Sequence, residues 1–179
     1  FFEYQMIQRS YDDFVKESQQ YESILQRYKE SGEVYVDPLF HPTAKIPESQ
    51  VKLDSSSNWD RIDDYYPAPL FQPDLINSDF ILQGNLENCH LAAAFADISN
   101  DVEKVKSLFD IETSERICGT IENSINLKCG AVVIKFHAFG KTTPVLIDTF
   151  IHTTKYGHEP FFIHPSNKNV SPWFCLVEK

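Results

Sequence analysis

Residues 77–99 read NSDFILQGNLENCHLAAAFADIS and decide the fold. Apolar residues recur in the second half of this stretch at steps of three and four: Leu91, Phe95 and Ile98. This period predicts a short, largely buried helix from Cys89 to Ile98. Asn88 stands immediately before it, and asparagine is a favoured N-cap residue. Because the preceding run LQGNLEN has the composition of a loop, a cysteine is placed at the first position of a helix.

A cysteine in this position can act as a nucleophile. The unpaired backbone N–H groups and the dipole of a helix N-terminus favour the thiolate, which is the reactive form. Gln83, six residues upstream, can direct its amide NH₂ to the same point, so that it and the Cys89 N–H form two donors for an oxyanion. Gly84 lets the loop approach closely. From these residues alone, a small core cysteine and an ordinary surface glutamine remain the commoner interpretations.

Composition limits the class of protein. The 179 residues suffice for one domain, and the formal charge of −10, from 16 Lys and Arg against 26 Asp and Glu, argues against nucleic acid as a partner. No run approaches the roughly 18 apolar residues of a membrane-spanning helix, and no signal peptide is recognisable at the start. The four cysteines form no CxxC pair, which predicts reduced thiols in the cytoplasm and neither a disulfide framework nor a zinc site.

Local patterns predict further elements. An aromatic and aliphatic stripe indicates one long helix over residues 3–31, ended by Gly32. Residues 38–73 are rich in proline and predict an irregular wrap over the core, with the acidic residues Asp60, Asp63 and Asp64 in a solvated loop.

The second half of the chain predicts one more helix, a small sheet and a final helix. Asp101 is placed to cap the helix VEKVKSLF. Strands are expected over residues 131–136, 144–148 and 161–164, with a hairpin turn at Gly140. The last helix is expected to have Ser171 as its cap and Pro172 at its first position, and to continue past Lys179.

The stretch around Cys89 resembles the nucleophile block of calpains, whose pattern is close to D-I-x-Q-G-x-L-G-D-C-W-L-L-A-A. The spacing of Gln83 and Cys89, the glycine after the glutamine and the Leu-x-Ala run after the cysteine all match. Other stretches are also similar to calpain patterns: VYVDPLFHP (residues 34–42), Trp59-Asp-Arg61, GKTTPVLIDTFI (residues 140–151) and FIHPSNKNVSPWFCLVEK (residues 162–179). Residues from about 32 to 179 are covered.

The resemblance implies an α/β (α+β), papain-like cysteine protease fold. Residues 1–31 would form an N-terminal helix, and residues 32–179 the first subdomain of a calpain-like core, with a buried nucleophile helix and a small sheet. Cys89 would be the nucleophile and Gln83 an oxyanion donor of a cytoplasmic endopeptidase acting on polypeptides. A second subdomain beyond Lys179 would bring the catalytic His and Asn, because the six histidines here match no catalytic pattern of the family. The 179-residue chain alone is therefore expected to be inactive.

Several residues depart from the calpain pattern. His90 replaces a tryptophan, Asn88 an aspartate, Glu87 a glycine and Thr149 an aspartate. These departures leave open a second interpretation, a catalytically degenerate calpain-like module that binds or regulates other proteins. Calcium is possible by resemblance, through an acidic residue near Asp79 and a second acidic residue. The second position holds Ser171 here, so the residues of a complete site are not all present.

Overall fold

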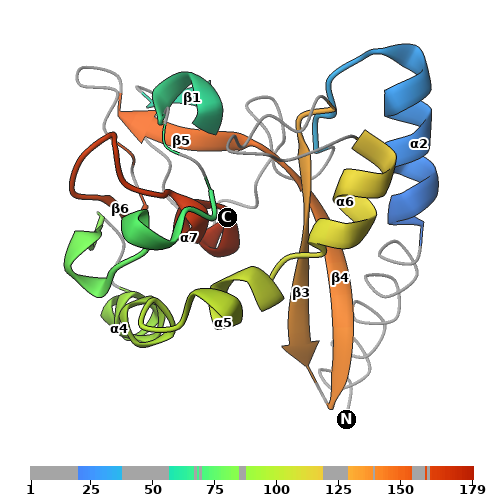
Figure 1. Ribbon diagram of the computed structural model, residues 1–179. Helices are drawn as coiled ribbons and strands as arrows, with labels where there is room; N and C mark the ends of the chain where they lie inside the picture. Colours follow the sequence, from blue (N-terminus) through green and yellow to red (C-terminus); the bar gives the residue numbers. More distant parts are fainter. Residues whose placement is uncertain are drawn as a thin grey trace, which may run out of the picture.

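The computed structural model describes residues 20–37, 57–66, 68, 70–84, 88–118, 129–138, 140–154, 160 and 162–179. Helices and small antiparallel sheets alternate along the chain, which confirms the predicted α+β class (Figure 1). The helices are α2 (Tyr21–Ser31), α3 (Ile62–Tyr65), α4 (Cys89–Ile98), α5 (Val102–Ser107), α6 (Ile111–Cys118) and α7 (Trp173–Glu178), with short 3₁₀ turns η1 (Pro73–Leu75) and η2 (Ser78–Phe80). The strands are β1 (Ser57–Arg61), β2 (Ile81–Leu82), β3 (Ala131–Ala138), β4 (Lys141–Asp148), β5 (Phe150–Thr154) and β6 (His164–Pro165).

Within the described residues the strands pair antiparallel in three separate two-stranded sheets, β1 with β5, β2 with β6 and β3 with β4. The β3–β4 hairpin runs in register from Ala131 opposite Asp148 to Ala138 opposite Lys141. Gly140 has a φ of 73° at its turn, a conformation that favours glycine. The predicted hairpin is confirmed. In Figure 1 it stands between the pair α2 and α6 on one side and the remaining helices on the other.

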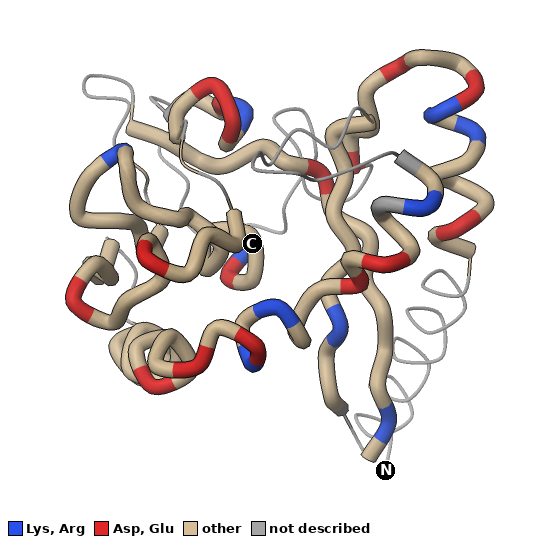
Figure 2. Tube along the Cα trace, viewed as in Figure 1, with Lys and Arg blue, Asp and Glu red and all other residues tan. Residues whose placement is uncertain are grey.

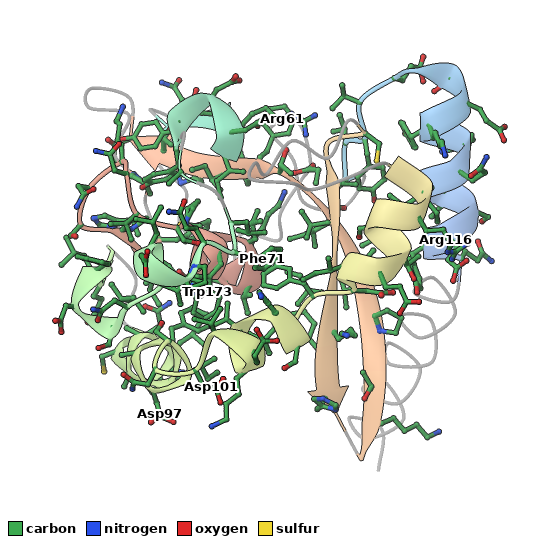
Figure 3. All side chains as sticks on the ribbon, viewed as in Figure 1. Arg61, Phe71, Asp97, Asp101, Arg116 and Trp173 are labelled. Carbon is green, nitrogen blue, oxygen red and sulfur yellow. The ribbon has the colours of Figure 1, made fainter. Side chains whose placement is uncertain are left out.

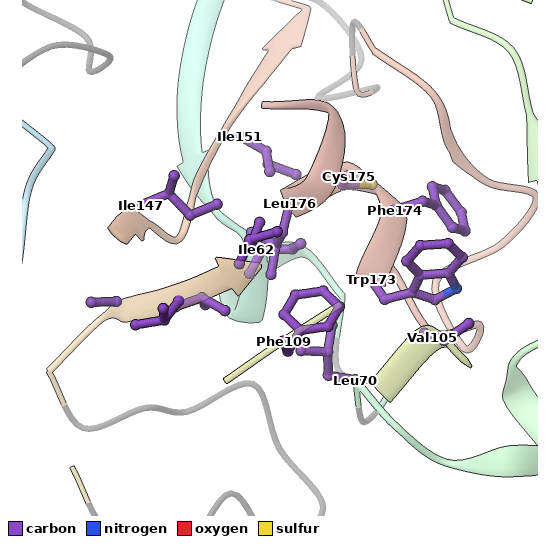
Figure 4. Close-up of a cluster of buried hydrophobic side chains, with 14 of the residues drawn as sticks. Ile62, Leu70, Val105, Phe109, Ile147, Ile151, Trp173, Phe174, Cys175 and Leu176 are labelled. Carbon is purple, nitrogen blue, oxygen red and sulfur yellow. The ribbon is translucent and has the colours of Figure 1, made fainter. Parts of the chain in front are cut away.

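The terminal helix α7 forms the centre of the hydrophobic core. Four of its six residues are buried: Trp173, Phe174, Cys175 and Leu176. Figure 4 shows these side chains together with apolar residues from several other elements, among them Ile62, Val105 and Ile151. The Phe95 ring of α4 meets the Trp173 ring edge-on at a centroid distance of 5.3 Å. Packing against α7 therefore fixes α4 in the fold.

Helix α2 ends as its sequence predicts. Gly32 follows Ser31 with a φ of 70° and donates its backbone N–H to the Tyr28 carbonyl. Leu25 is buried, and the helix packs on α6 and β4. Across the contact with α6, Arg116 (labelled in Figure 3) pairs with Glu22 at 2.8 Å. Residues 3–19 of the predicted helix lie outside the described residues.

The prediction of an irregular wrap is wrong for residues 57–65, which form β1 and α3. Asp60 accepts a hydrogen bond from the Thr153 hydroxyl at 2.5 Å, so it is not in a solvated loop. Of the three acidic residues expected there, only Asp64 is exposed, and Asp60 and Asp63 are partly buried. The partner strand of β1 is β5, about ninety residues later, and a pairing over that distance leaves no local period in the sequence.

The structure differs from the sequence predictions at one additional helix, at the start of α7 and at one strand. Helix α6 was not predicted, although Asp110 just before it accepts a hydrogen bond from the Thr113 N–H in the manner of a cap residue. At the other end of the chain Pro172, not Ser171, directly precedes α7. The Ser171 hydroxyl donates instead to the Leu70 carbonyl at 2.5 Å and is buried. The strand expected over residues 161–164 is likewise displaced, to His164–Pro165.

The prediction that all cysteines are reduced is also wrong. Cys129 is disulfide-bonded, whereas Cys89 and Cys175 are free thiols. A disulfide depends on which cysteines the fold brings together, and spacing along the chain does not reveal this for isolated cysteines.

A buried ion pair joins the end of the chain to the end of β4. The Lys179 ammonium contacts the Asp148 carboxylate, and both side chains are almost fully buried. Asp148 also accepts hydrogen bonds from the backbone N–H groups of Asp37 at 2.7 Å and Phe150 at 2.9 Å. Burial lowers the pKa of Lys179, and the Asp148 charge opposes that shift. The carboxylate is thus neutralised and hydrogen-bonded in the interior.

We predict that Lys179→Met destabilises the fold by about 3–5 kcal/mol, because it leaves the Asp148 carboxylate buried without its cation. Urea unfolding followed by circular dichroism measures the change. Lys104→Met is the matched control, since Lys104 lies 3.8 Å from Asp101 with both side chains largely exposed. The control should unfold nearly as the parent does, and equal effects of the two substitutions would contradict the role given to the buried pair.

Candidate active site

Helix α4 begins at Cys89 and ends at Ile98, as the sequence predicts. It packs against β2 and η2, the elements that lead into the Gln83 loop. Cys89 is a free, exposed thiol. The first turn of α4 contains no acidic side chain, so no carboxylate there opposes a thiolate at position 89.

The prediction of a largely buried α4 is only half right. Phe95 is buried and Leu91, Ala92 and Ile98 are partly covered. The opposite face is exposed and carries Cys89, His90, Ala93, Ala94 and Asp97; Figure 3 labels Asp97 on this face. The alanine-rich composition does not distinguish a helix buried all round from one that buries a single face. The described residues cover a single face of α4.

Asn88 occupies the N-cap position, but its side chain does not cap the helix. The Asn88 carbonyl accepts the backbone N–H groups of Leu91 at 2.8 Å and Ala92 at 3.2 Å. Its side-chain amide nitrogen donates to Glu178 Oε1 on α7. Glu178 Oε2 accepts the Ile163 N–H at 2.6 Å. The residue before the cysteine is thus tied to the core helix.

Glu178 was not singled out from the sequence. It lies ninety residues from Asn88 along the chain, so nothing local connects the two. Burial raises the pKa of Glu178, while the hydrogen bonds from Asn88 and from the Ile163 N–H, and the nearby His164, act in the opposite direction.

Gln83 directly follows β2 and is exposed. Strand β2 pairs with β6, with Leu82 opposite His164, so the loop starts from a fixed base. Residues 85–87, Glu87 among them, lie outside the described residues. That the Gln83 amide and the Cys89 sulfur face the same point therefore stays a prediction.

The histidines of the described residues lie in four different elements. His90 is exposed on α4, and adjacent helix positions point about 100° apart, which directs its ring away from Cys89. His137, in β3, contacts the Thr142 hydroxyl at 2.9 Å. His152, in β5, is buried between Trp59 and Phe162, and burial lowers its pKa. His41 and His158 lie outside the described residues.

The residues at the expected calcium position do not fit the ion. Ser171 stands where the resemblance places an acidic ligand, and its buried hydroxyl already donates to the Leu70 carbonyl. Asp79 is exposed on η2, where its backbone N–H bonds to the Asn77 side chain. Among the described residues, no group of three or more His, Cys, Asp and Glu side chains could hold a metal.

Two further properties of the described residues are the distribution of their charges and the hydropathy of their helices. Figure 2 shows acidic and basic residues interspersed along the described helices. No helix of the described residues is long and apolar enough to cross a membrane.

Comparison with known proteins identifies the family. A family model for calpain family cysteine proteases matches residues 35–179. The chain therefore belongs to the calpain family, as its motifs predicted. Calpain-A of Drosophila melanogaster is 28% identical over 163 residues, which is 91% of this chain. The chain spans only 18% of the length of that relative.

We predict that iodoacetamide modifies Cys89 of the folded chain rapidly and Cys175 hardly at all. The Cys175 thiol is buried and donates to the Ile163 carbonyl at 3.3 Å, and burial raises its pKa. Mass-spectrometric mapping of both cysteines over time at pH 8 measures the two rates, and unfolding in urea should abolish the difference. Equal rates in the folded chain would show that the two environments differ less than the structure describes.

Proposed function

We propose that this chain is the nucleophile-bearing subdomain of a calpain-type cysteine endopeptidase. Cys89 is the nucleophile, and Gln83 and the Cys89 backbone N–H are the oxyanion donors. The single observation that carries the proposal is the exposed thiol at the first position of α4, six residues after Gln83, inside the region that matches the family model.

The proposed chemistry is acyl transfer. The Cys89 thiolate attacks a peptide carbonyl carbon and forms a C–S bond, and the carbonyl oxygen becomes an oxyanion that the two N–H donors stabilise. The C–N bond of the tetrahedral intermediate then breaks, and the amine leaves with a proton. Water hydrolyses the thioester and restores the thiol. In papain-like enzymes a histidine, oriented by an asparagine, moves these protons.

By resemblance, that histidine and asparagine come from a second subdomain that follows this one. His90 lies beside Cys89 in the sequence, and adjacent helix positions point about 100° apart, so it is not proposed as the base. Without a base the 179-residue chain alone should not turn over peptides, since general base catalysis contributes about 10²–10⁴-fold. Polypeptide substrates, a cytoplasmic location and the division into an N-terminal helix (residues 1–31) and a protease subdomain (residues 32–179) belong to the same proposal.

A degenerate, protein-binding module is the second candidate. Its support is His90, which replaces the family's tryptophan and is exposed on α4. Thr149 supports it less than the sequence suggested. It is buried, and its hydroxyl accepts a hydrogen bond from Arg61 at 2.9 Å. A structural contact thus accounts for Thr149 in place of the family's second aspartate.

We predict that Gln83→Ala lowers kcat/KM by about 10²–10³-fold in a polypeptide that carries this chain together with the second subdomain, because one oxyanion donor is lost. The decrease should fall mainly on kcat. Hydrolysis of a fluorogenic peptide measures both constants.

Two variants make this experiment decisive. Gln72→Ala is the matched control, because Gln72 is an exposed glutamine whose side chain caps nothing, and it should leave both constants unchanged. Cys89→Ala should abolish hydrolysis. If that polypeptide hydrolyses no peptide, or if Cys89→Ala retains activity, the protease proposal fails and the binding module becomes the better interpretation.

A further inference from the structure

We propose that Glu178 is a positioning residue for the nucleophile: by holding the Asn88 side chain it fixes the peptide group whose N–H lies next to the Cys89 sulfur. This inference rests on the proposed function of Cys89 and adds to it a residue from α7. No resemblance assigns this role.

The backbone of Asn88 orients the peptide group that precedes Cys89. Its φ of −119° and ψ of 38° lie outside the extended region that N-cap residues usually adopt. The ψ angle of Asn88 sets the plane of the peptide group between Asn88 and Cys89, and hence the direction of the Cys89 N–H. A restraint on Asn88 is therefore a restraint on the proposed oxyanion donor.

The carboxylate of Glu178 restrains the Asn88 side chain. Its amide nitrogen donates to Glu178 Oε1, while Glu178 Oε2 accepts the Ile163 N–H. Glu178 is itself held by α7, whose residues from Trp173 to Leu176 are buried in the core. The carboxylate thus transmits the rigidity of the core to the residue before Cys89.

Asparagine at position 88 can donate a hydrogen bond to Glu178, which an ionised aspartate cannot. The calpain pattern has an aspartate there, and an aspartate facing Glu178 would bring two carboxylates together, which disfavours their ionised forms. Asparagine offers an N–H donor to the carboxylate instead. Among the described residues the buried asparagine oxygen Oδ1 has no hydrogen-bond partner, so there the contact with Glu178 is the polar interaction that holds this side chain.

The pair can be tested by exchanging its two functional groups. In Asn88→Asp the carboxylates of residues 88 and 178 repel and the contact is lost. In the double variant Asn88→Asp with Glu178→Gln, the new amide can donate to the carboxylate at position 88 while its oxygen still accepts the Ile163 N–H. Both variants carry a carboxylate at position 88, so the direct effect of that group on the thiolate is common to them, and Glu178→Gln alone reports the effect of removing the Glu178 charge. In Glu178→Gln alone, reversal of the Asn88 amide restores a hydrogen bond, and this variant is the control.

The expected results follow from the loss and return of one charge-assisted hydrogen bond. We expect iodoacetamide to modify Cys89 about tenfold more slowly in Asn88→Asp than in the double variant at pH 8. The rate in Glu178→Gln should stay within about twofold of the parent, as its amide pair keeps the contact. Hydrogen–deuterium exchange of the Cys89 amide, measured by NMR, should accelerate in Asn88→Asp and slow again in the double variant.

The outcomes separate this proposal from the protease proposal. If the double variant behaves as Asn88→Asp in both measurements, charge alone explains the effect and the positioning role is overturned. If Cys89 of the parent reacts no faster than it does in urea, the catalytic role of Cys89 is in doubt, but amide exchange still tests the positioning. A change in unfolding midpoint without a change in alkylation or exchange would show a purely structural contact and would also overturn the proposal.

Discussion

The structure depends on the end of α7, where two adjacent charged residues reach to different parts of the chain. Glu178 contacts the Asn88 side chain and the Ile163 N–H, and Lys179 contacts the Asp148 carboxylate at the end of β4. Burying ionised groups is costly unless they are paired or hydrogen-bonded. Lys179 is paired with Asp148, and the Glu178 carboxylate accepts two hydrogen bonds. One helix terminus therefore joins the start of α4 and the segment before β6 to the β3–β4 hairpin, which Figure 1 shows apart from α4 and β6.

This arrangement gives Cys89 and Cys175, the free cysteines of the described residues, opposite environments. Cys175 lies in the middle of α7, fully buried, with its thiol donating to a backbone carbonyl. Cys89 lies at the first position of α4 with its thiol exposed. The same core that makes the first thiol inert holds the helix that presents the second. The exposed face of α4 around Cys89 is the surface that the proposed second subdomain would cover.

Features with local causes could be predicted from the sequence. The start and end of α4, the Asp101 cap of α5, the Gly32 end of α2 and the β3–β4 hairpin each depend on residues within a few positions of one another. The Asp101 side chain, for example, accepts the backbone N–H groups of Glu103 and Lys104. The calpain motifs added the family, which the family model confirms.

Features that depend on distant residues could not be predicted. The pairing of β1 with β5, the disulfide of Cys129 and the contact of Asn88 with Glu178 all join positions that only the folded chain brings together. The contact with Glu178 determines how the Asn88 side chain is used. The residue type of Asn88 correctly indicated a helix start, but its side chain is used for a tertiary contact and not for the cap. At the candidate site, the sequence placed Cys89 correctly on its helix and gave no indication of Glu178.

The central claim is that folding activates Cys89 as a nucleophile. The most direct test is the rate of Cys89 alkylation by iodoacetamide at pH 6, compared between the folded chain and the same chain in urea. At this pH an ordinary cysteine is almost entirely protonated, whereas a helix N-terminus favours the thiolate. The account predicts that Cys89 reacts several-fold faster in the folded chain, once the effect of urea on a free-cysteine peptide has been subtracted. A rate in the folded chain equal to or below that in urea would contradict it.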